Sequence, residues 1–123
     1  MSSRYRKGRR FEYYVTKLLR NRGFEVVRSA GSHTDFDLVA LKQEFDSGYP
    51  SNGTTILLVQ CKHRPASRDF ERVRERSLDY NVPVALAYLS KTNKVMFSCY
   101  LCGERIVLTS LDDRCATWAP KTK

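Results

Sequence analysis

Apolar residues near the N-terminus recur with the spacing of a helix. The apolar residues at positions i, i+3, i+4, i+7 and i+8 are Phe11, Tyr14, Val15, Leu18 and Leu19. This spacing puts all of them on one side of an amphipathic helix. Gly23 then supplies the backbone conformation that ends many helices. The mostly basic residues 4–10 form either an arm or the first turn of this helix.

Short apolar runs follow, with the length and composition of strands. They cover residues 24–28, 37–41, 54–61, 82–89 and 94–100, with a weaker run at 104–108. The run at 54–61 is almost continuously apolar, so we expect a central strand covered on both faces. Residues 42–53 contain Gly, Pro, Asp and Asn. That composition predicts a long exposed connection, which we interpret as a hairpin loop.

A second helix is predicted over residues 67–80, where charged residues alternate with a few apolar ones. The order helix, three strands, helix and further strands indicates the α/β class. We expect a central mixed β-sheet of about five strands flanked by helices. A chain of 123 residues without an internal repeat is expected to form one domain over residues 1–123.

The charge of the chain is strongly positive and unevenly placed. The formal net charge is +9, and residues 1–28 hold nine basic side chains against two acidic ones, which is +7 of that total. Such a one-sided field attracts polyanions, so nucleic acid is the expected partner. No apolar run approaches the roughly 20 residues that span a bilayer, and no signal peptide is recognised. We therefore expect a cytoplasmic protein with no membrane and no small-molecule substrate.

Four cysteines are few for a disulfide scaffold. They are Cys61, Cys99, Cys102 and Cys115. The pair Cys99 and Cys102 has metal-ligand spacing, but a zinc site needs two more ligands nearby. Buried free thiols are therefore the favoured interpretation, and a disulfide becomes plausible only in a hyperthermophile.

Polar residues that can bind a metal stand at the ends of two predicted strands. Asp37 opens one strand, and Gln60 and Lys62 end the most apolar one. Because Gln60 and Lys62 are two apart, they project from the same face, while Cys61 between them points the opposite way and offers its backbone carbonyl. With Glu12 from the helix, they can hold Mg²⁺ beside a phosphodiester and activate a water.

A simpler interpretation of these residues stays open. Gln60 and Lys62 could mark only the point where a strand meets solvent. Glu12 could be ion-paired with Arg9 or Lys17 of its own helix. The order and spacing of the three elements, taken together, favour the metal site.

Several short stretches form a more specific pattern. Lys7-Gly8 precedes Glu12, and the runs Leu-Leu at 18–19, Gly-Phe at 23–24, Val-Val-Arg-Ser-Ala-Gly-Ser at 26–32 and Asp-Leu-Val-Ala at 37–40 follow. In these features the chain resembles the archaeal Holliday junction resolvases, which belong to the restriction-endonuclease-like PD-(D/E)xK nucleases. The resemblance covers about residues 5–89 and is strongest over residues 4–40.

The resemblance implies a restriction-endonuclease-like fold and a homodimer that depends on Mg²⁺, for which Mn²⁺ can substitute. Such a dimer nicks two opposing strands of a four-way DNA junction, whose two-fold symmetry it matches. The implied source is an archaeon or an archaeal virus, so the implied location is the cytoplasm of an archaeal cell or of a virus-infected host. Phe70 and residues 82–89 are candidates for dimer contacts, although a place in the core is the favoured interpretation.

Roles follow from the resemblance position by position. Glu12 resembles the helix glutamate that supports the metal, Asp37 the principal ligand, and Lys62 the catalytic lysine. Ser32 resembles a loop serine that helps to organise the site, and Arg28 an arginine of the junction-binding surface. The predicted catalytic residues are thus Glu12, Ser32, Asp37, Gln60 and Lys62, and the predicted metal ligands are Glu12, Asp37, Gln60 and Cys61. The predicted DNA contacts are Arg4, Arg6, Lys7, Arg9, Arg10, Arg28, Arg64 and Arg68.

Gln60 departs from the family pattern, which has Asp or Glu at this position. An amide oxygen coordinates Mg²⁺ but brings no negative charge, so metal affinity should fall. Two other functions therefore stay open. One is a non-catalytic branched-DNA-binding protein that has lost activity through Gln60, and the other is a nuclease of the same fold that acts on other DNA.

Overall fold

The computed structural model describes the backbone of residues 3–29, 36–46 and 49–109 and the side chains of residues 8–29, 36–43 and 53–105. Two helices and six strands alternate in an order that agrees with the sequence prediction. They are α1 (Ser3–Asn21), β1 (Glu25–Arg28), β2 (Leu38–Asp46), β3 (Tyr49–Lys62), α2 (Ser67–Arg76), β4 (Val84–Leu89), β5 (Val95–Leu101) and β6 (Glu104–Thr109).

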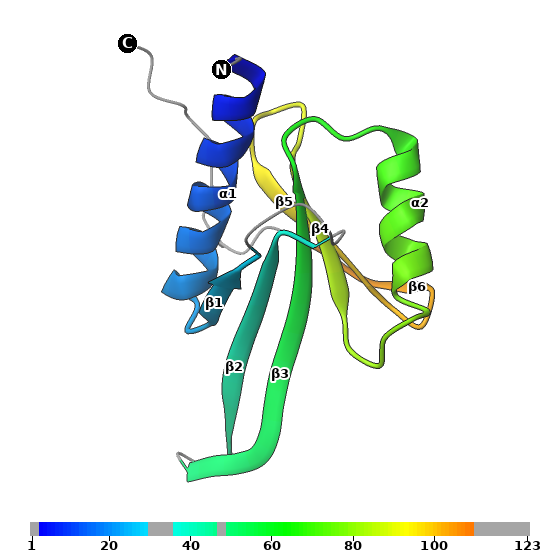
Figure 1. The fold of residues 1–123 in the computed structure, drawn as a ribbon. Coiled ribbons are helices and arrows are strands. Elements are labelled where there is room, and N and C mark those ends of the chain that lie inside the picture. The colour runs from blue at the N-terminus through cyan, green and yellow to red at the C-terminus, as the bar shows by residue number, and fades with distance from the viewer. Residues whose placement is uncertain (1–2, 30–35, 47–48, 110–123) are drawn as a thin grey trace.

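The strands form one sheet in the order of the sequence, from β1 to β6. Neighbouring strands are antiparallel except β3 and β4, which are parallel and are joined through α2. The helices lie on opposite faces of the sheet, with α1 against β1 and β3 and α2 against β4 and β5 (Figure 1). The predicted α/β class and mixed sheet are confirmed, with six strands instead of about five.

Helix α1 buries the stripe that its sequence predicts. Phe11, Val15 and Leu19 are almost completely buried against the sheet. Gly23 ends the helix with φ +90°, a conformation that costs glycine little. The N–H of Phe24 donates to the Leu19 carbonyl, and the N–H of Gly23 donates to the Arg20 carbonyl. These two bonds form a Schellman motif. This tight ending returns the chain into β1.

Strand β3 lies in the middle of the sheet and is covered on both faces, as predicted. Leu57, Val59 and Cys61 pack in the cluster under α1, whereas Leu58 packs in the cluster under α2. Because side chains alternate along a strand, Gln60 and Lys62 share the α2 face with Leu58. The polar end of β3 therefore faces the side of α2.

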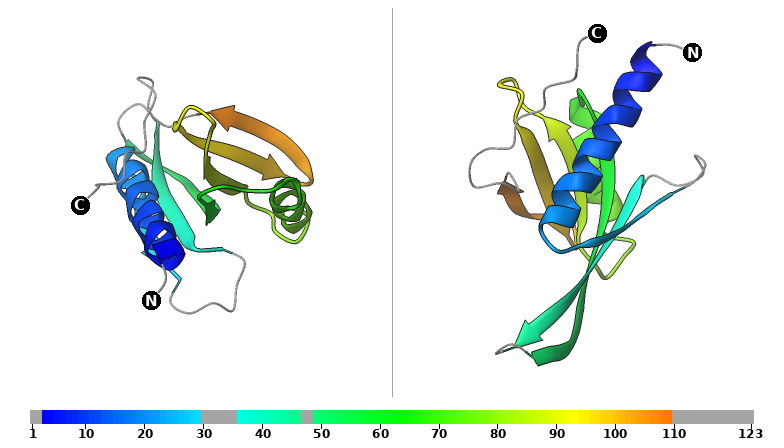
Figure 2. Two further views of the ribbon diagram at one scale, coloured as in Figure 1. Left: turned by 90° about the horizontal axis from the view of Figure 1, so that it is seen from above. Right: turned by 90° about the vertical axis from the view of Figure 1, so that its left-hand side faces the viewer.

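The predicted hairpin over residues 42–53 is confirmed, since its two strands pair antiparallel, but the predicted length of its loop is wrong. β2 continues to Asp46 and β3 starts at Tyr49, so the connection is only residues 47–48. The two strands form a ribbon that projects beyond the rest of the sheet (Figure 1 and the right view of Figure 2). Gly, Pro and Asn are disfavoured in central strands, but a ladder already paired at Leu38↔Val59 can extend through them outside the core.

The second half of the chain forms the other core. Val84 to Ala87 of β4 have no exposed surface, and Phe70 of α2 packs edge-on against Tyr88, with ring centroids 5.0 Å apart. Residues 84–87 are therefore core residues, which was the favoured interpretation, while the partly buried Phe70 packs against that core. α2 ends at Arg76, four residues before the predicted end, where the chain turns towards β4.

Candidate metal centre

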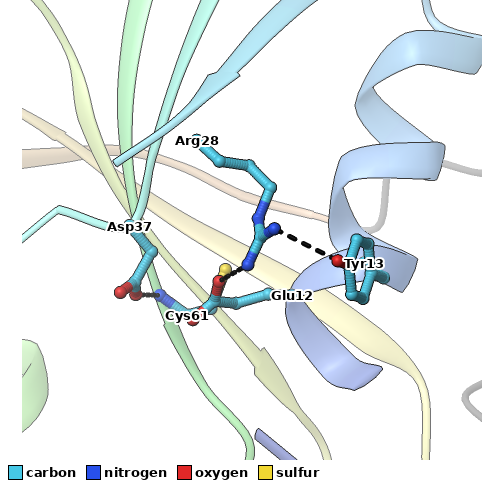
Figure 3. Close-up of polar contacts among 5 residues, drawn as sticks. All are labelled: Glu12, Tyr13, Arg28, Asp37 and Cys61. Carbon is cyan, nitrogen blue, oxygen red and sulfur yellow. Dashed lines mark hydrogen bonds and ion pairs between the residues drawn. The ribbon is translucent and has the colours of Figure 1, made fainter. Parts of the chain in front are cut away.

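Asp37 sits where β2 begins and β3 ends. The N–H of Asp37 donates to the Val59 carbonyl at 2.8 Å, so the residue continues the ladder one step beyond Leu38↔Val59. Its carboxylate Oδ2 in turn accepts the backbone N–H of Cys61 at 2.8 Å (Figure 3). The two bonds fix the carboxylate at the shared end of the two strands.

Glu12 reaches the same place from α1. It follows the buried Phe11, which anchors this turn of the helix on the sheet. Its Oε1 lies 3.2 Å from Nη2 of Arg28, which comes from the last position of β1, and the two side chains are only 25% and 34% exposed. The ion pair lies beside Asp37 and Cys61 (Figure 3). The partner that the structure gives Glu12 is thus across the fold, not on its own helix.

Tyr13 completes the contacts of Arg28. The guanidinium lies 4.5 Å from the centre of the Tyr13 ring, and Nη1 donates to the phenol oxygen at 3.3 Å. Arginine stacks well on an aromatic face, and here it does so while bound to a carboxylate. Sequence reasoning missed Tyr13. Its signal was an aromatic residue that is adjacent to Glu12 but outside the apolar stripe of the helix.

The charges of this cluster act on one another. Burial raises the pKa of Asp37 above its ordinary value, and the negative charge of Glu12 raises it further. The N–H of Cys61 and the positive charges of Lys62 and Arg28 oppose this rise. Glu12, Asp37 and Lys62, which the sequence predicted to converge, are therefore close enough to influence one ionisation.

Gln60 and Lys62 border a cleft of about 550 Å³ between β3 and α2. Its other lining residues are charged, namely Arg68, Asp69, Glu71, Arg72 and Glu75. Oε1 of Gln60 is buried and has no hydrogen-bond partner in the part of the chain that the structure describes. A buried amide oxygen without a partner is costly, and a bound cation would satisfy it.

The residues present fit a hard divalent cation. Two carboxylates and an amide oxygen are the ligands that Mg²⁺ takes, and it commonly keeps several waters besides one or two protein carboxylates. Within the described ranges, no three His, Cys, Asp or Glu side chains group closely enough to hold a metal by themselves. Gln60 Oε1, the predicted third side-chain donor, would supplement the two carboxylates.

The cysteine side chains do not supply this donor set. Burial, together with the charges of Asp37 and Glu12, raises the pKa of the Cys61 thiol well above its ordinary value, so the sulfur stays protonated. Burial raises the pKa of Cys99 to about 11. Cys61, Cys99 and Cys102 are free thiols, but Cys102 is exposed in the β5–β6 turn, so the prediction of a buried thiol is wrong there. Cys115 lies outside the described residues.

The predicted DNA contacts occupy different surroundings. Arg9 and Arg10 are exposed on α1. Arg64 donates to the Ser90 carbonyl at 3.4 Å and to Asn93 Oδ1 at 3.2 Å, while Arg68 lines the cleft. The backbone of Arg4, Arg6 and Lys7 belongs to α1, but their side chains are outside the described part of the structure, as is Ser32.

The part of α2 that lines the cleft was also missed. Arg68 was predicted beside the site, but Arg72 and Glu75 share its side of the helix at i+4 and i+7. That spacing was visible in the sequence. What was missing was the knowledge that α2 turns this side towards the end of β3.

The family of the chain follows from a comparison with protein-family models. The model for archaeal Holliday junction resolvases (hjc) matches residues 3–70, which is more than half of the 123 residues. The chain belongs to this family. The matched segment contains Glu12, Asp37, Gln60 and Lys62, and by family the protein is a junction-resolving nuclease of archaeal type.

Other comparisons add less. No curated protein matches the chain. Among solved structures, the Holliday junction resolvase Hjc from Archaeoglobus fulgidus, an archaeal hyperthermophile, is 22% identical, with a TM-score of 0.49 over 73% of this chain and 74% of that one. Across the described residues, no helix is long and apolar enough to cross a membrane.

Proposed function

We propose that this resolvase-family protein hydrolyses phosphodiesters of four-way DNA junctions at the cluster around Asp37, with a divalent metal ion. The observation that supports this best is the Asp37 carboxylate, which the N–H of Cys61 holds at the end of β3 next to the buried oxygen of Gln60, within the segment that matches the family. A bound Mg²⁺ would lower the pKa of a water and stabilise the charge that develops on the scissile phosphate.

Asp37 and Gln60 are proposed to hold this ion. Asp37 is suited to the task because the N–H of Cys61 fixes one carboxylate oxygen, which preorganises the ligand. Gln60 offers the buried oxygen that has no partner within the described chain. The backbone carbonyl of Cys61 is the proposed further ligand. Glu12, which approaches from α1, is the fourth proposed ligand.

Lys62 is proposed to orient the attacking water and to contact the scissile phosphate. It lines the same cleft as Gln60, and its charge acts on the carboxylate of Asp37. A lysine ammonium is a compact charge with three donors, which suits a phosphate oxygen and a water together. Ser32 is proposed to help organise the site, as the family resemblance implies.

The basic residues of α1 and those near the cleft are proposed to bind the junction. Arg9 and Arg10 are exposed, and Arg68 lies beside Lys62 along the cleft. Contacts of this kind fix the position of a phosphate backbone without selecting bases, as recognition of a branched shape requires. We assign the same role to Arg4, Arg6, Lys7, Arg28 and Arg64.

A homodimer is proposed as the active form, because paired nicks in two opposing strands require two sites related by two-fold symmetry. The proposed location is the cytoplasm, where an archaeal chromosome or viral genome is found. Residues 1–123 are proposed to form a single nuclease domain. Light scattering on a size-exclusion column measures the mass of the particle, and a monomer of 14.3 kDa at the concentrations that give cutting would contradict the dimer.

Incubation of the purified chain with a synthetic four-way junction and Mg²⁺ tests this function. Paired symmetric nicks that disappear in the Asp37→Ala variant, while junction binding remains, are the expected result. Binding without nicks, with either Mg²⁺ or Mn²⁺, would instead identify a non-catalytic binder. A linear duplex of the same sequence is the control, and equal cutting of both would identify a nuclease for other DNA.

A further inference from the structure

Arg28 lies within the acidic cluster and not simply on a surface near it. Its guanidinium is held on one side by Glu12 Oε1 at 3.2 Å and on the other by the Tyr13 hydroxyl and ring. An arginine guanidinium stays protonated in proteins, so this side chain is always charged. A permanent cation is thus built in next to the proposed metal ligands.

This cation changes the electrostatic balance of the metal-free site. The carboxylate of Glu12 is only 25% exposed, and an unpaired negative charge is disfavoured in such a position. Arg28 supplies the positive charge that pairs with it, at 3.2 Å. A half-buried position screens these charges less than open water does. Arg28 therefore does in the metal-free protein part of what a divalent cation would do there.

The same contact opposes the entry of a metal. A carboxylate that accepts a hydrogen bond from a guanidinium has lone pairs engaged, and a fixed positive charge nearby repels a second cation. We propose that Arg28 is a stand-in cation for the metal centre, which neutralises Glu12 while the metal is absent and must release Glu12 when the metal binds. This inference rests on the proposed function, which assigns Glu12 and Asp37 to the metal.

The Tyr13 ring can hold the Arg28 side chain after it has left Glu12. Stacking on the ring does not depend on Glu12, so the guanidinium can leave the carboxylate and remain ordered at the border of the site. Tyr13 is 51% exposed, so its burial contributes little to the core. We assign it the role of a positioning residue for Arg28.

Metal titration of the full chain without DNA tests the proposal. Arg28→Gln and Arg28→Met remove the charge, the second while keeping an unbranched stem, and calorimetry with MnCl₂ and MgCl₂ measures the affinity. Both variants should bind the metal about three- to tenfold more tightly than the wild type, because a competitor and a repelling charge are gone. Arg28→Lys keeps the charge and should stay near the wild-type value.

Two controls separate this effect from a general loss of positive charge. Arg76→Gln breaks an exposed ion pair, to Asp79 Oδ2 at 2.9 Å, between residues that do not line the cleft, and should leave metal affinity unchanged. In the E12Q background, the gain from Arg28→Gln should shrink, since the two residues act through one contact. Affinity in Arg28→Gln that equals or falls below wild type, including no binding in either, would overturn the proposal.

Thermal unfolding gives a second readout. In EDTA, Arg28→Gln should unfold at a lower temperature than Arg76→Gln, and added Mn²⁺ should raise its melting temperature more than it raises that of wild type. Equal metal-induced shifts would contradict the stand-in role. The proposed function fails separately: if wild type and Asp37→Ala bind metal alike, the ion does not bind at this cluster at all.

Discussion

The negative charge of Asp37 should make the metal-free protein less stable than a variant with a neutral side chain at this position. Replacement of Asp37 by Asn keeps the size of the side chain and an oxygen that can accept the N–H of Cys61, now 2.8 Å from Oδ2. What disappears is a charge that burial and the charge of Glu12 both disfavour. We expect Asp37→Asn to gain about 1 kcal/mol of stability, a typical trade of stability against activity, and to lose cutting.

A comparison with Asp37→Ala separates the charge from the hydrogen bond. Alanine removes the cost of the buried charge as well, but it leaves the N–H of Cys61 without its acceptor. An unsatisfied buried donor costs about 1–3 kcal/mol. Asp37→Asn should therefore be more stable than Asp37→Ala by about that amount, although both variants lack the carboxylate.

The pH dependence gives the sign of the effect. Because the pKa of Asp37 is raised in the folded protein, the folded state holds this proton more tightly than the unfolded chain does. The contribution of Asp37 to stability therefore decreases as the pH rises from the ordinary pKa of the residue to its raised pKa in the folded protein. Above the raised pKa, the contribution stays at that lower level. The advantage of Asp37→Asn should be complete at neutral pH and should shrink as the pH falls through that window.

Urea denaturation in EDTA, followed by circular dichroism over a range of pH, measures these differences. For a chain of this size, 1 kcal/mol also corresponds to about 4 °C in melting temperature. Asp79→Asn is the control, because it removes the same charge from an exposed ion pair with Arg76. The reasoning is wrong if Asp37→Asn is less stable than wild type, or if Asp79→Asn gains as much.

Three further predictions concern metal, DNA and core. Gln60→Glu should keep or increase junction cutting at low Mg²⁺, since a carboxylate binds the ion more tightly; a large loss in a nicking assay would give glutamine a role beyond ligation. Arg9→Ala with Arg10→Ala should weaken junction binding and lower the salt slope by about two; an unchanged slope in salt titrations would remove these residues from the interface. Val59→Ala, at a fully buried position of β3, should cost about 1–3 kcal/mol in urea denaturation, and a loss below 0.5 kcal/mol would contradict its place in the core.

Much of the fold was predictable because the patterns were long and consistent. The helical stripe ending at Gly23 predicts α1, and the continuous apolar run before Gln60 predicts a central strand. The ribbon of β2 and β3 was not predictable, since Gly, Pro and Asn in residues 42–53 favour a loop when only local preference is considered. Cross-strand pairing extends the ladder there, and pairing partners cannot be read from one segment.

The positions of some candidate site residues on the fold were predictable, but their contacts were not, and their roles stay predictions. Alternation along β3 correctly places Gln60 and Lys62 on one face. That Arg28 would bind Glu12 depends on how α1 crosses the end of β1, which no spacing within either element reveals. Arg28 was predicted to contact DNA, and that role stays a prediction. The contact that the structure shows is the ion pair with Glu12.

Anomalous diffraction from crystals grown with Mn²⁺ tests the central claim most directly. We predict a manganese peak bound by Asp37 and Gln60, with the Arg28 guanidinium moved away from Glu12. A metal bound elsewhere on the chain, with Asp37 still engaged only by the N–H of Cys61 and junction cutting intact in Asp37→Ala, would contradict the account.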